Sequence, residues 1–145
     1  MVKILFVCHG NICRSPMAEF ILKDMVRRAG MESAFEIASA AVSREEVGNP
    51  VYPPAKAELA RHGIDCSGRV ARQITREDLE YYDWIYYMDE SNFSYLKWLF
   101  GAVPGKCRKL LQRDVEDPWY TDRFDRTWTD LEEGCRKILE ESALC

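Results

Sequence analysis

Two residues near the start of the chain, Cys8 and Arg14, have the types and the spacing needed for phosphoryl transfer. A cysteine thiolate is a strong nucleophile, and a planar guanidinium can hold two oxygens of a phosphate. Ser15 follows directly, where its hydroxyl can donate to the sulfur and help it leave a phosphoenzyme. Cys8 alone would more often be a small buried core residue. The hypothesis therefore depends on the spacing of the cysteine, the arginine and the serine.

The segments on either side of these residues would hold them in a short anion-binding loop that contains Gly10. The apolar, β-favouring run at 4–7 predicts a buried strand. Ser15-Pro16 predicts the start of a helix, with Ser15 as its N-cap. Backbone N–H groups at a helix N-terminus point toward a bound anion. The helix dipole and Arg14 would both stabilise Cys8 as a thiolate.

Other residues in and near the loop have expected roles of their own. Asn11 tolerates the left-handed backbone that a tight loop needs, and His9 is expected at the rim of the pocket. His62, which precedes Gly63, is expected as a helix C-cap or as a hydrogen-bond partner behind the loop. These expectations follow from residue type and position alone.

A second part of the chain, Asp117-Pro118-Trp119-Tyr120, is the best candidate for the proton transfers. Phosphoryl transfer needs an acid for the leaving group and a base for water, and one carboxyl group can serve both in turn. Pro118 favours an extended backbone at Asp117. Trp119 and Tyr120 would line a slot for a flat aromatic substrate. A simple chain break with core aromatics explains the same residues, so the local sequence leaves both interpretations open.

The composition is that of an ordinary globular protein. The chain has 145 residues, of which 47% are hydrophobic and 30% charged, and this predicts a single domain over 1–145. A net charge of −4 argues against a general nucleic-acid-binding surface. The sequence has no run of membrane-spanning length and no signal-peptide pattern. We therefore expect a cytoplasmic protein that binds neither nucleic acid nor membrane.

The cysteines are spread along the chain at Cys8, Cys13, Cys66, Cys107, Cys135 and Cys145. They form no CxxC pair, and no histidine stands at metal-ligand spacing from them. We therefore expect neither a zinc site nor a disulfide framework. Cys13 differs from the others because it shares the loop with Cys8.

Strand and helix patterns alternate along the chain. Apolar β-favouring runs predict strands at 4–7, 35–38, 84–88 and 109–111. Helical spacing and caps predict helices at 16–29, 55–61 and 126–141, a short helix capped by Thr75, and one from Asp89 or Ser91 to Gly101. Segments 39–43 and 114–122 are expected to be loops. This order predicts an α/β fold with a parallel sheet covered on both faces, whose ligands bind beyond the carboxyl ends of the strands.

The motifs together resemble the low-molecular-weight protein tyrosine phosphatases over nearly the whole chain. The phosphate loop of that family is similar to Val7-Cys8-His9-Gly10-Asn11-Ile12-Cys13-Arg14-Ser15-Pro16-Met17-Ala18-Glu19. Further matches follow at 39–43, 47–48, 62–64, 71–75, 88–92 and 117–120.

This resemblance implies a three-layer sandwich with a central four-stranded parallel sheet and helices on both faces. It implies hydrolysis of phosphotyrosine and small aryl phosphates in two steps, without metal or cofactor. Cys8 would be the nucleophile, Arg14 would bind phosphate, and Asp117 would be the acid and then the base. The expected partners are phosphotyrosine-containing proteins, including an autophosphorylating tyrosine kinase, and the expected state is a monomer or a weak dimer.

The resemblance also assigns supporting roles. Phosphate binding and loop support are expected from His9, Gly10, Asn11, Ile12, Cys13, Ser15, Ser39 and His62, and the substrate pocket from Glu45, Trp119 and Tyr120. Within the first set, Asn11, Ser15, Ser39 and His62 are expected to form one polar network. Cys13 is expected to form a disulfide with an oxidised Cys8 and so shield it from over-oxidation.

Some pocket positions depart from the vertebrate-type members of the family. His9 stands where leucine or threonine is frequent, and Glu45 stands where many members carry an aromatic wall residue. An acidic Glu45 would disfavour acidic peptides as substrates. Trp119 replaces a frequent tyrosine and keeps the wall aromatic.

Three other functions fit parts of the pattern. Phosphoarginine phosphatases carry a threonine where this chain has Ile12, so Ile12 favours the tyrosine-type activity. Arsenate reductases share the Cys–x5–Arg loop but need two further redox cysteines after the third strand, where this chain has only Cys107. A non-enzymatic anion-binding module would have no need of Cys8, Arg14 and Asp117 together.

Overall fold

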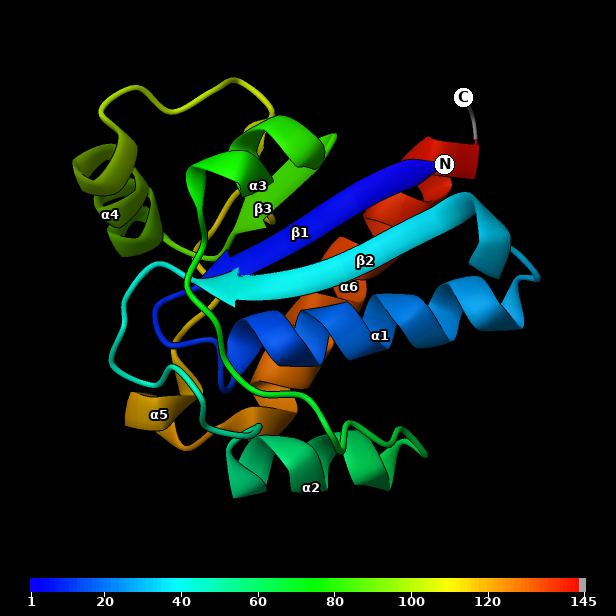
Figure 1. Ribbon diagram of the computed structural model, residues 1–145. Coiled ribbons are helices and arrows are strands. Elements are labelled where there is room, and N and C mark those ends of the chain that lie inside the picture. Colours follow the sequence, from blue (N-terminus) through cyan, green and yellow to red (C-terminus); the bar gives the residue numbers. More distant parts are fainter. Residues whose placement is uncertain (144–145) are drawn as a thin grey trace.

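The computed structural model describes residues 1–143 and is built around a parallel sheet of four strands (Figure 1). The strands are β1 (Val2–Cys8), β2 (Phe35–Ala41), β3 (Trp84–Tyr87) and β4 (Cys107–Lys109), in the spatial order β2-β1-β3-β4. The predicted α/β fold with a four-stranded parallel sheet is confirmed. Because β1 has β2 on one side and β3 on the other, the loop after β1 lies at the point where the strand order reverses.

Helices cover both faces of this sheet. They are α1 (Arg14–Arg28), α2 (Pro53–Arg61), α3 (Arg76–Tyr81), α4 (Glu90–Phe100), α5 (Pro118–Thr121) and α6 (Phe124–Ala143), with a short 3-10 turn, η1 (Glu32–Ala34). Figure 1 shows α1 and α6 on one face with α2 beyond them, and α3 and α4 on the other face. No helix among residues 1–143 is long and apolar enough to cross a bilayer.

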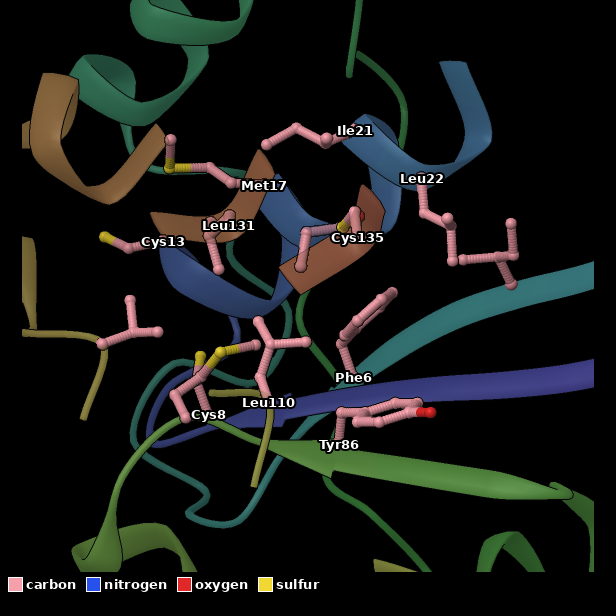
Figure 2. Packing of buried hydrophobic residues seen from close by; sticks show 14 of the residues in the cluster. Phe6, Cys8, Cys13, Met17, Ile21, Leu22, Tyr86, Leu110, Leu131 and Cys135 are labelled. Carbon is pink, nitrogen blue, oxygen red and sulfur yellow. The ribbon is translucent and has the colours of Figure 1, made fainter. Parts of the chain in front are cut away.

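The strand β1 is buried on both faces. Phe6 (Figure 2) and Ile4 belong to the core cluster under α1 and α6, and Leu5 and Val7 belong to the cluster under α3 and α4. All four side chains are fully buried. A central strand of a parallel sheet needs such a continuous apolar run, which is why the sequence identified it.

The segment after β4 runs back over the end of the sheet toward the loop that follows β1. The backbone N–H of Val115 donates to the carbonyl of Met88 at 3.0 Å. Gly134 of α6 permits the close approach of this segment, because a Cβ at that position would lie 2.5 Å from Cγ of Leu110. The sheet and α6 together therefore bring residues 110–117 to the end of β1.

Several element boundaries differ from the sequence expectation. Strand β2 continues through Ala41, because its residues keep pairing with β1 up to Cys8, so the loop expected at 39–43 is partly strand. The expected loop at 114–122 contains α5, and β4 lies two residues before the expected strand at 109–111. Helix α1 has Cys13 rather than Ser15 as its N-cap. Cys145 lies outside the described residues.

Candidate active site

Three hydrogen-bonding groups surround the sulfur of Cys8 at the end of β1. The backbone nitrogens of Asn11 and Ser15 lie 3.3 and 3.4 Å from Sγ, and Oγ of Ser15 lies 3.0 Å from it. Ser15 is in the first turn of α1, where backbone N–H groups have no partner inside the helix. Its N–H and its hydroxyl both point at the sulfur, so Ser15 serves the nucleophile instead of capping the helix. These donors favour negative charge at the sulfur and on an anion above it.

Asn11 holds the loop in its shape. Its backbone has φ 60°, in the left-handed region, as its residue type predicts. Its Oδ1 accepts from the Arg69 guanidinium and, at 3.2 Å, from the backbone N–H of Arg72. Its Nδ2 donates to Oγ of Ser15 at 2.7 Å and to Oγ of Ser39 at 2.9 Å. Four hydrogen bonds thus fix both ends of one side-chain amide.

This network also settles the direction of the contact between Ser15 and Cys8. Oγ of Ser15 accepts a hydrogen bond from Asn11, whose amide orientation is fixed by the donors that face its oxygen. The single hydroxyl hydrogen of Ser15 is therefore free to point at Sγ of Cys8, 3.0 Å away. Ser15 is the donor in this pair whenever the sulfur is charged.

The network contains two charged residues, Arg69 and Glu19, whose roles the sequence did not indicate. Arg69 donates to the carbonyl of Asn11 at 2.9 Å and to Oγ of Ser39 at 3.1 Å, and its Nε lies 3.9 Å from Glu19. Ser39 in turn donates to Glu19 at 2.6 Å. The only signal in the sequence was a basic, aperiodic stretch at 64–74, which says nothing of what its arginines contact.

The structure places His62 away from this network, which corrects the expected role behind the loop. His62 follows the end of α2, where its Nε2 lies 3.1 Å from Glu58, and its ring stacks on Trp128 at 3.6 Å. Its alternative expected position, a helix C-cap, is the one observed. Asn11, Ser15 and Ser39 do lie together, and Arg69 occupies the place expected for the histidine.

Arg14 is buried beside the nucleophile and is held by groups in the segments that follow β3 and β4. Its NH1 lies 2.6 Å from Oδ2 of Asp89 and donates to the carbonyl of Val115 at 2.8 Å. Burial acts to lower the pKa of Arg14, but the negative charges of Cys8, Asp117 and Asp89 raise it overall. Asp89, expected only as a helix cap, therefore has a second role in fixing the guanidinium.

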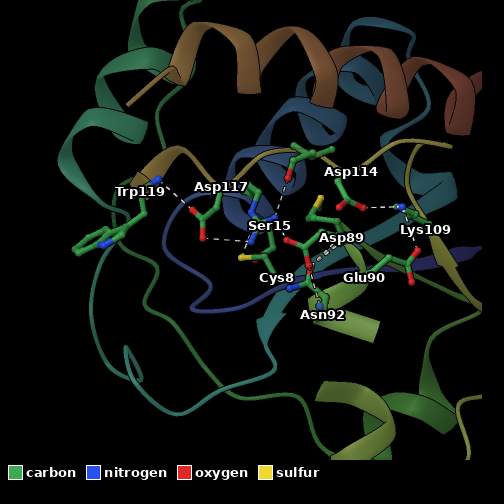
Figure 3. Close-up of polar contacts among 12 residues, drawn as sticks. Cys8, Ser15, Asp89, Glu90, Asn92, Lys109, Asp114, Asp117 and Trp119 are labelled. Carbon is green, nitrogen blue, oxygen red and sulfur yellow. Dashed lines mark hydrogen bonds and ion pairs between the residues drawn. The ribbon is translucent and has the colours of Figure 1, made fainter. Parts of the chain in front are cut away.

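Asp117 faces the same pocket from the N-terminus of α5 (Figure 3). Its Oδ1 accepts from the backbone N–H of Trp119 at 3.0 Å, and its Oδ2 lies 3.4 Å from NH2 of Arg14. The segment that carries it is fastened by Lys109, whose Nζ lies 2.6 Å from Asp114 and 3.1 Å from Glu90. The carboxyl group is thus held beside the phosphate-binding arginine.

A pocket of about 140 Å³ opens above the sulfur. It is lined by Cys8, His9, Gly10, Ile12, Cys13, Arg14, Glu45, Glu46, Asp117, Trp119 and Tyr120. Trp119 forms an aromatic wall and packs on Tyr52, with ring centres 4.8 Å apart. On the rim, Nε2 of His9 lies 2.8 Å from the carboxylate of Glu45. All the predicted pocket residues therefore line one cavity, together with Glu46, which sequence analysis did not identify.

The five cysteines among the described residues are free thiols. Cys13 lines the pocket but is buried, and its burial together with the charge of Cys8 raises its pKa far above the ordinary range. Burial also raises the pKa of Cys107 to about 11. Neither thiol is set up as a second nucleophile in the state that the structure describes.

The family model of the low molecular weight phosphotyrosine protein phosphatases matches residues 3–143. The chain belongs to this family. The protein-tyrosine-phosphatase YfkJ of Bacillus subtilis is 36% identical over 96% of this chain and 94% of its own, and its crystal structure superposes with a TM-score of 0.93. The human low molecular weight phosphotyrosine protein phosphatase is 37% identical over 96% of this chain and 94% of its own length.

An arginine phosphatase, YwlE, has the same fold. A Cys-to-Ser variant of YwlE with a phosphorylated active-site serine superposes with a TM-score of 0.87 and 28% identity over 97% of this chain and 95% of the other. YwlE is a Bacillus subtilis protein. Solved structures with this fold are therefore named both as tyrosine phosphatases and as arginine phosphatases.

We predict that substitutions can separate two contributions of Asn11 to stability, the hydrogen bonds of its side-chain amide and the strain of its left-handed backbone. Asn11→Ala removes four hydrogen bonds and forces a left-handed alanine, and we expect it to lower the free energy of unfolding by about 3 kcal/mol. Asn11→Gly removes the same hydrogen bonds without the backbone strain, and we expect it to be about 1 kcal/mol more stable than the alanine variant. Urea unfolding measures both. Equal stability of the two variants would show that the loop does not hold this residue in a left-handed conformation.

Proposed function

We propose that this family member is a protein tyrosine phosphatase that works through a cysteinyl-phosphate intermediate on Cys8. The observation that carries the proposal is the meeting, in one pocket, of a sulfur surrounded by donors, a buried arginine and a carboxyl group. A phosphate on the sulfur would find backbone N–H groups beneath it and the Arg14 guanidinium beside it. These fixed donors bind most tightly when the transferring group carries the most charge on its equatorial oxygens.

In the first step, the Cys8 thiolate attacks phosphorus and the bond from phosphorus to the tyrosine oxygen breaks. Asp117 gives its proton to that oxygen, so the phenol leaves neutral. Oδ2 of Asp117 lies 3.4 Å from NH2 of the phosphate-binding Arg14, and this supports the role, because an acid must lie within reach of the leaving oxygen.

In the second step, the Asp117 carboxylate takes a proton from water, and the water oxygen attacks phosphorus. The sulfur–phosphorus bond breaks and inorganic phosphate is released. The hydroxyl of Ser15 donates a hydrogen bond to the leaving sulfur and so stabilises the returning thiolate. The direction of this hydrogen bond, fixed by Asn11, supports the assignment.

The substrate class follows from the walls of the pocket. Trp119 and Tyr120 offer aromatic surface for the ring of phosphotyrosine or a small aryl phosphate. Glu45 on the rim, with a side chain 66% exposed, disfavours acidic peptides. We infer that the substrates are cytoplasmic phosphotyrosine proteins, including an autophosphorylating tyrosine kinase.

Two of the other functions have little support. Thioredoxin-coupled arsenate reduction needs reactive cysteines beside Cys8, whereas Cys107 is buried and has a raised pKa. A non-enzymatic anion-binding module has no use for a carboxyl group held against the anion-binding arginine, because it would repel the anion.

Replacement of the nucleophile tests the proposal directly. Because a serine hydroxyl is far less acidic than a thiol, Cys8→Ser should release no measurable phosphate from phosphotyrosine peptides yet still bind them in calorimetry. Cys66→Ser, which changes a buried cysteine outside the pocket, should keep the activity. Full activity of the Cys8 variant would refute the mechanism.

The role of Asp117 predicts a dependence on the leaving group. Asp117→Asn should lower kcat about 100-fold on phenyl phosphate, whose leaving group needs a proton, and much less on aryl esters with very good leaving groups. The matched control is Asp122→Asn, an isosteric change at an exposed residue just after α5. Asp122 has a left-handed backbone, which asparagine also tolerates. Equal losses on both esters would argue against general acid catalysis by Asp117.

A second candidate activity, phosphoarginine hydrolysis, comes from the likeness to YwlE. Ile12 lines the pocket with an apolar side chain that offers the guanidinium nitrogens no hydrogen bond. We predict that the native chain prefers phosphotyrosine peptides over phosphoarginine peptides by at least tenfold in kcat/KM, a ratio of the size that single pocket contacts give. Ile12→Thr should reduce this preference, and Ile12→Val should not. A native preference for phosphoarginine would reverse the assignment.

A further inference from the structure

An exposed tryptophan on α4 has no role in the fold or in the proposed chemistry. Trp98 has 78% of its surface exposed, although a tryptophan side chain is among the largest apolar surfaces that a residue can present. The buried face of α4 is supplied by Asn92 and Leu96. Trp98 therefore lies on the outer side of the helix, where a charged residue would favour solubility.

Contacts between rings connect this tryptophan to the rim of the pocket. Trp98 meets Tyr95, one helical turn before it, edge to face with ring centres 6.1 Å apart. Tyr95 meets His9 in the same way at 5.4 Å. His9 lines the pocket and is held on its other side by the carboxylate of Glu45. An aromatic strip made of His9, Tyr95 and Trp98 thus runs from the pocket onto α4.

This strip lies apart from the aromatic wall that already serves the pocket. The wall is made by Trp119 and Tyr120 of α5 and rests on Tyr52. In Figure 1, α5 and α4 lie on different sides of the loop that follows β1. Under the proposed function a phosphotyrosine ring would lie against the wall, which leaves the strip for another part of the same substrate.

We propose that Tyr95 and Trp98 form a docking site for an apolar side chain of the phosphoprotein, about three residues from its phosphotyrosine. The proposal rests on the proposed phosphatase function, because it places a neighbouring segment of that substrate. The strip is continuous with the pocket, and its two ring-to-ring steps place Trp98 at most about 12 Å from the His9 ring. An extended peptide covers about 3.4 Å per residue, so about three residues separate the phosphotyrosine from the side chain that would contact Trp98.

The test compares peptides that differ at one position. One peptide has phosphotyrosine flanked by alanines, and a panel carries a single leucine at each position from one to four residues on either side. In the native chain, leucine about three residues away on one side should raise kcat/KM about tenfold through a lower KM, the gain expected when roughly 50 Å² of apolar surface leaves water. Other positions should gain little.

Variants assign this gain to the strip. In Trp98→Ala, the ratio of kcat/KM for the favoured leucine peptide to that for p-nitrophenyl phosphate should fall about tenfold. Lys97→Ala, an exposed neighbour on the same helix, should leave the ratio unchanged. Circular dichroism checks that both variants keep the native helix content.

The possible failures are distinct. Hydrolysis of phosphotyrosine with no leucine preference, or a preference that survives in Trp98→Ala, would overturn the docking site and leave the phosphatase function standing. No hydrolysis of any phosphotyrosine peptide would overturn both. A native dimer that Trp98→Ala dissociates in sedimentation, with an unchanged leucine preference, would assign the strip to a second copy of the chain and overturn the docking site.

Discussion

The site depends on the amide of Asn11. A loop of this length can aim its N–H groups at one sulfur only if the chain reverses sharply, and the left-handed backbone at Asn11 makes that turn. Such a conformation is unfavourable for a residue with a side chain unless the surroundings hold it. Four hydrogen bonds to the amide supply that restraint. The same amide sets the direction of the Ser15 hydroxyl, so loop shape and sulfur environment have one cause.

The parallel sheet brings residues that are far apart in the sequence close together at one of its edges. Cys8 ends β1, Asp89 follows β3, and Asp117 lies beyond β4, so three strands deliver their groups to the same place. Arg14 joins them, since it contacts both carboxylates and the carbonyl of Val115. A guanidinium with partners in the segments that follow two further strands has little freedom to rotate. The fold therefore contributes preorganisation that a loop alone lacks.

Sequence patterns predicted the sheet and the pocket-lining residues well, because these depend on local periodicity and on a motif with fixed spacing. They failed where a contact joins distant segments through residues of ordinary type. Arg69 reaches Asn11 across 58 positions, and no local feature separates it from a surface arginine. His62 was expected in its place, but its side chain is held at the end of α2 by Glu58 and Trp128. Ser15 was expected as an N-cap because that is the frequent role of serine, and the sulfur of Cys8 competes for both of its donors.

The floor and the rim of the pocket obey different constraints, and this bears on the proposed substrate range. On the floor, each polar group has several partners, so a single change disturbs many contacts. The rim is held by fewer links, such as the pair of His9 and Glu45 and the tilted ring contact of Trp119 with Tyr52. Rim residues can therefore change without loss of the anion site, which is consistent with one fold that includes tyrosine and arginine phosphatases. In this chain the rim joins an acidic group to an aromatic strip on α4, and selectivity among phosphoproteins would arise there, outside the groups that perform the chemistry.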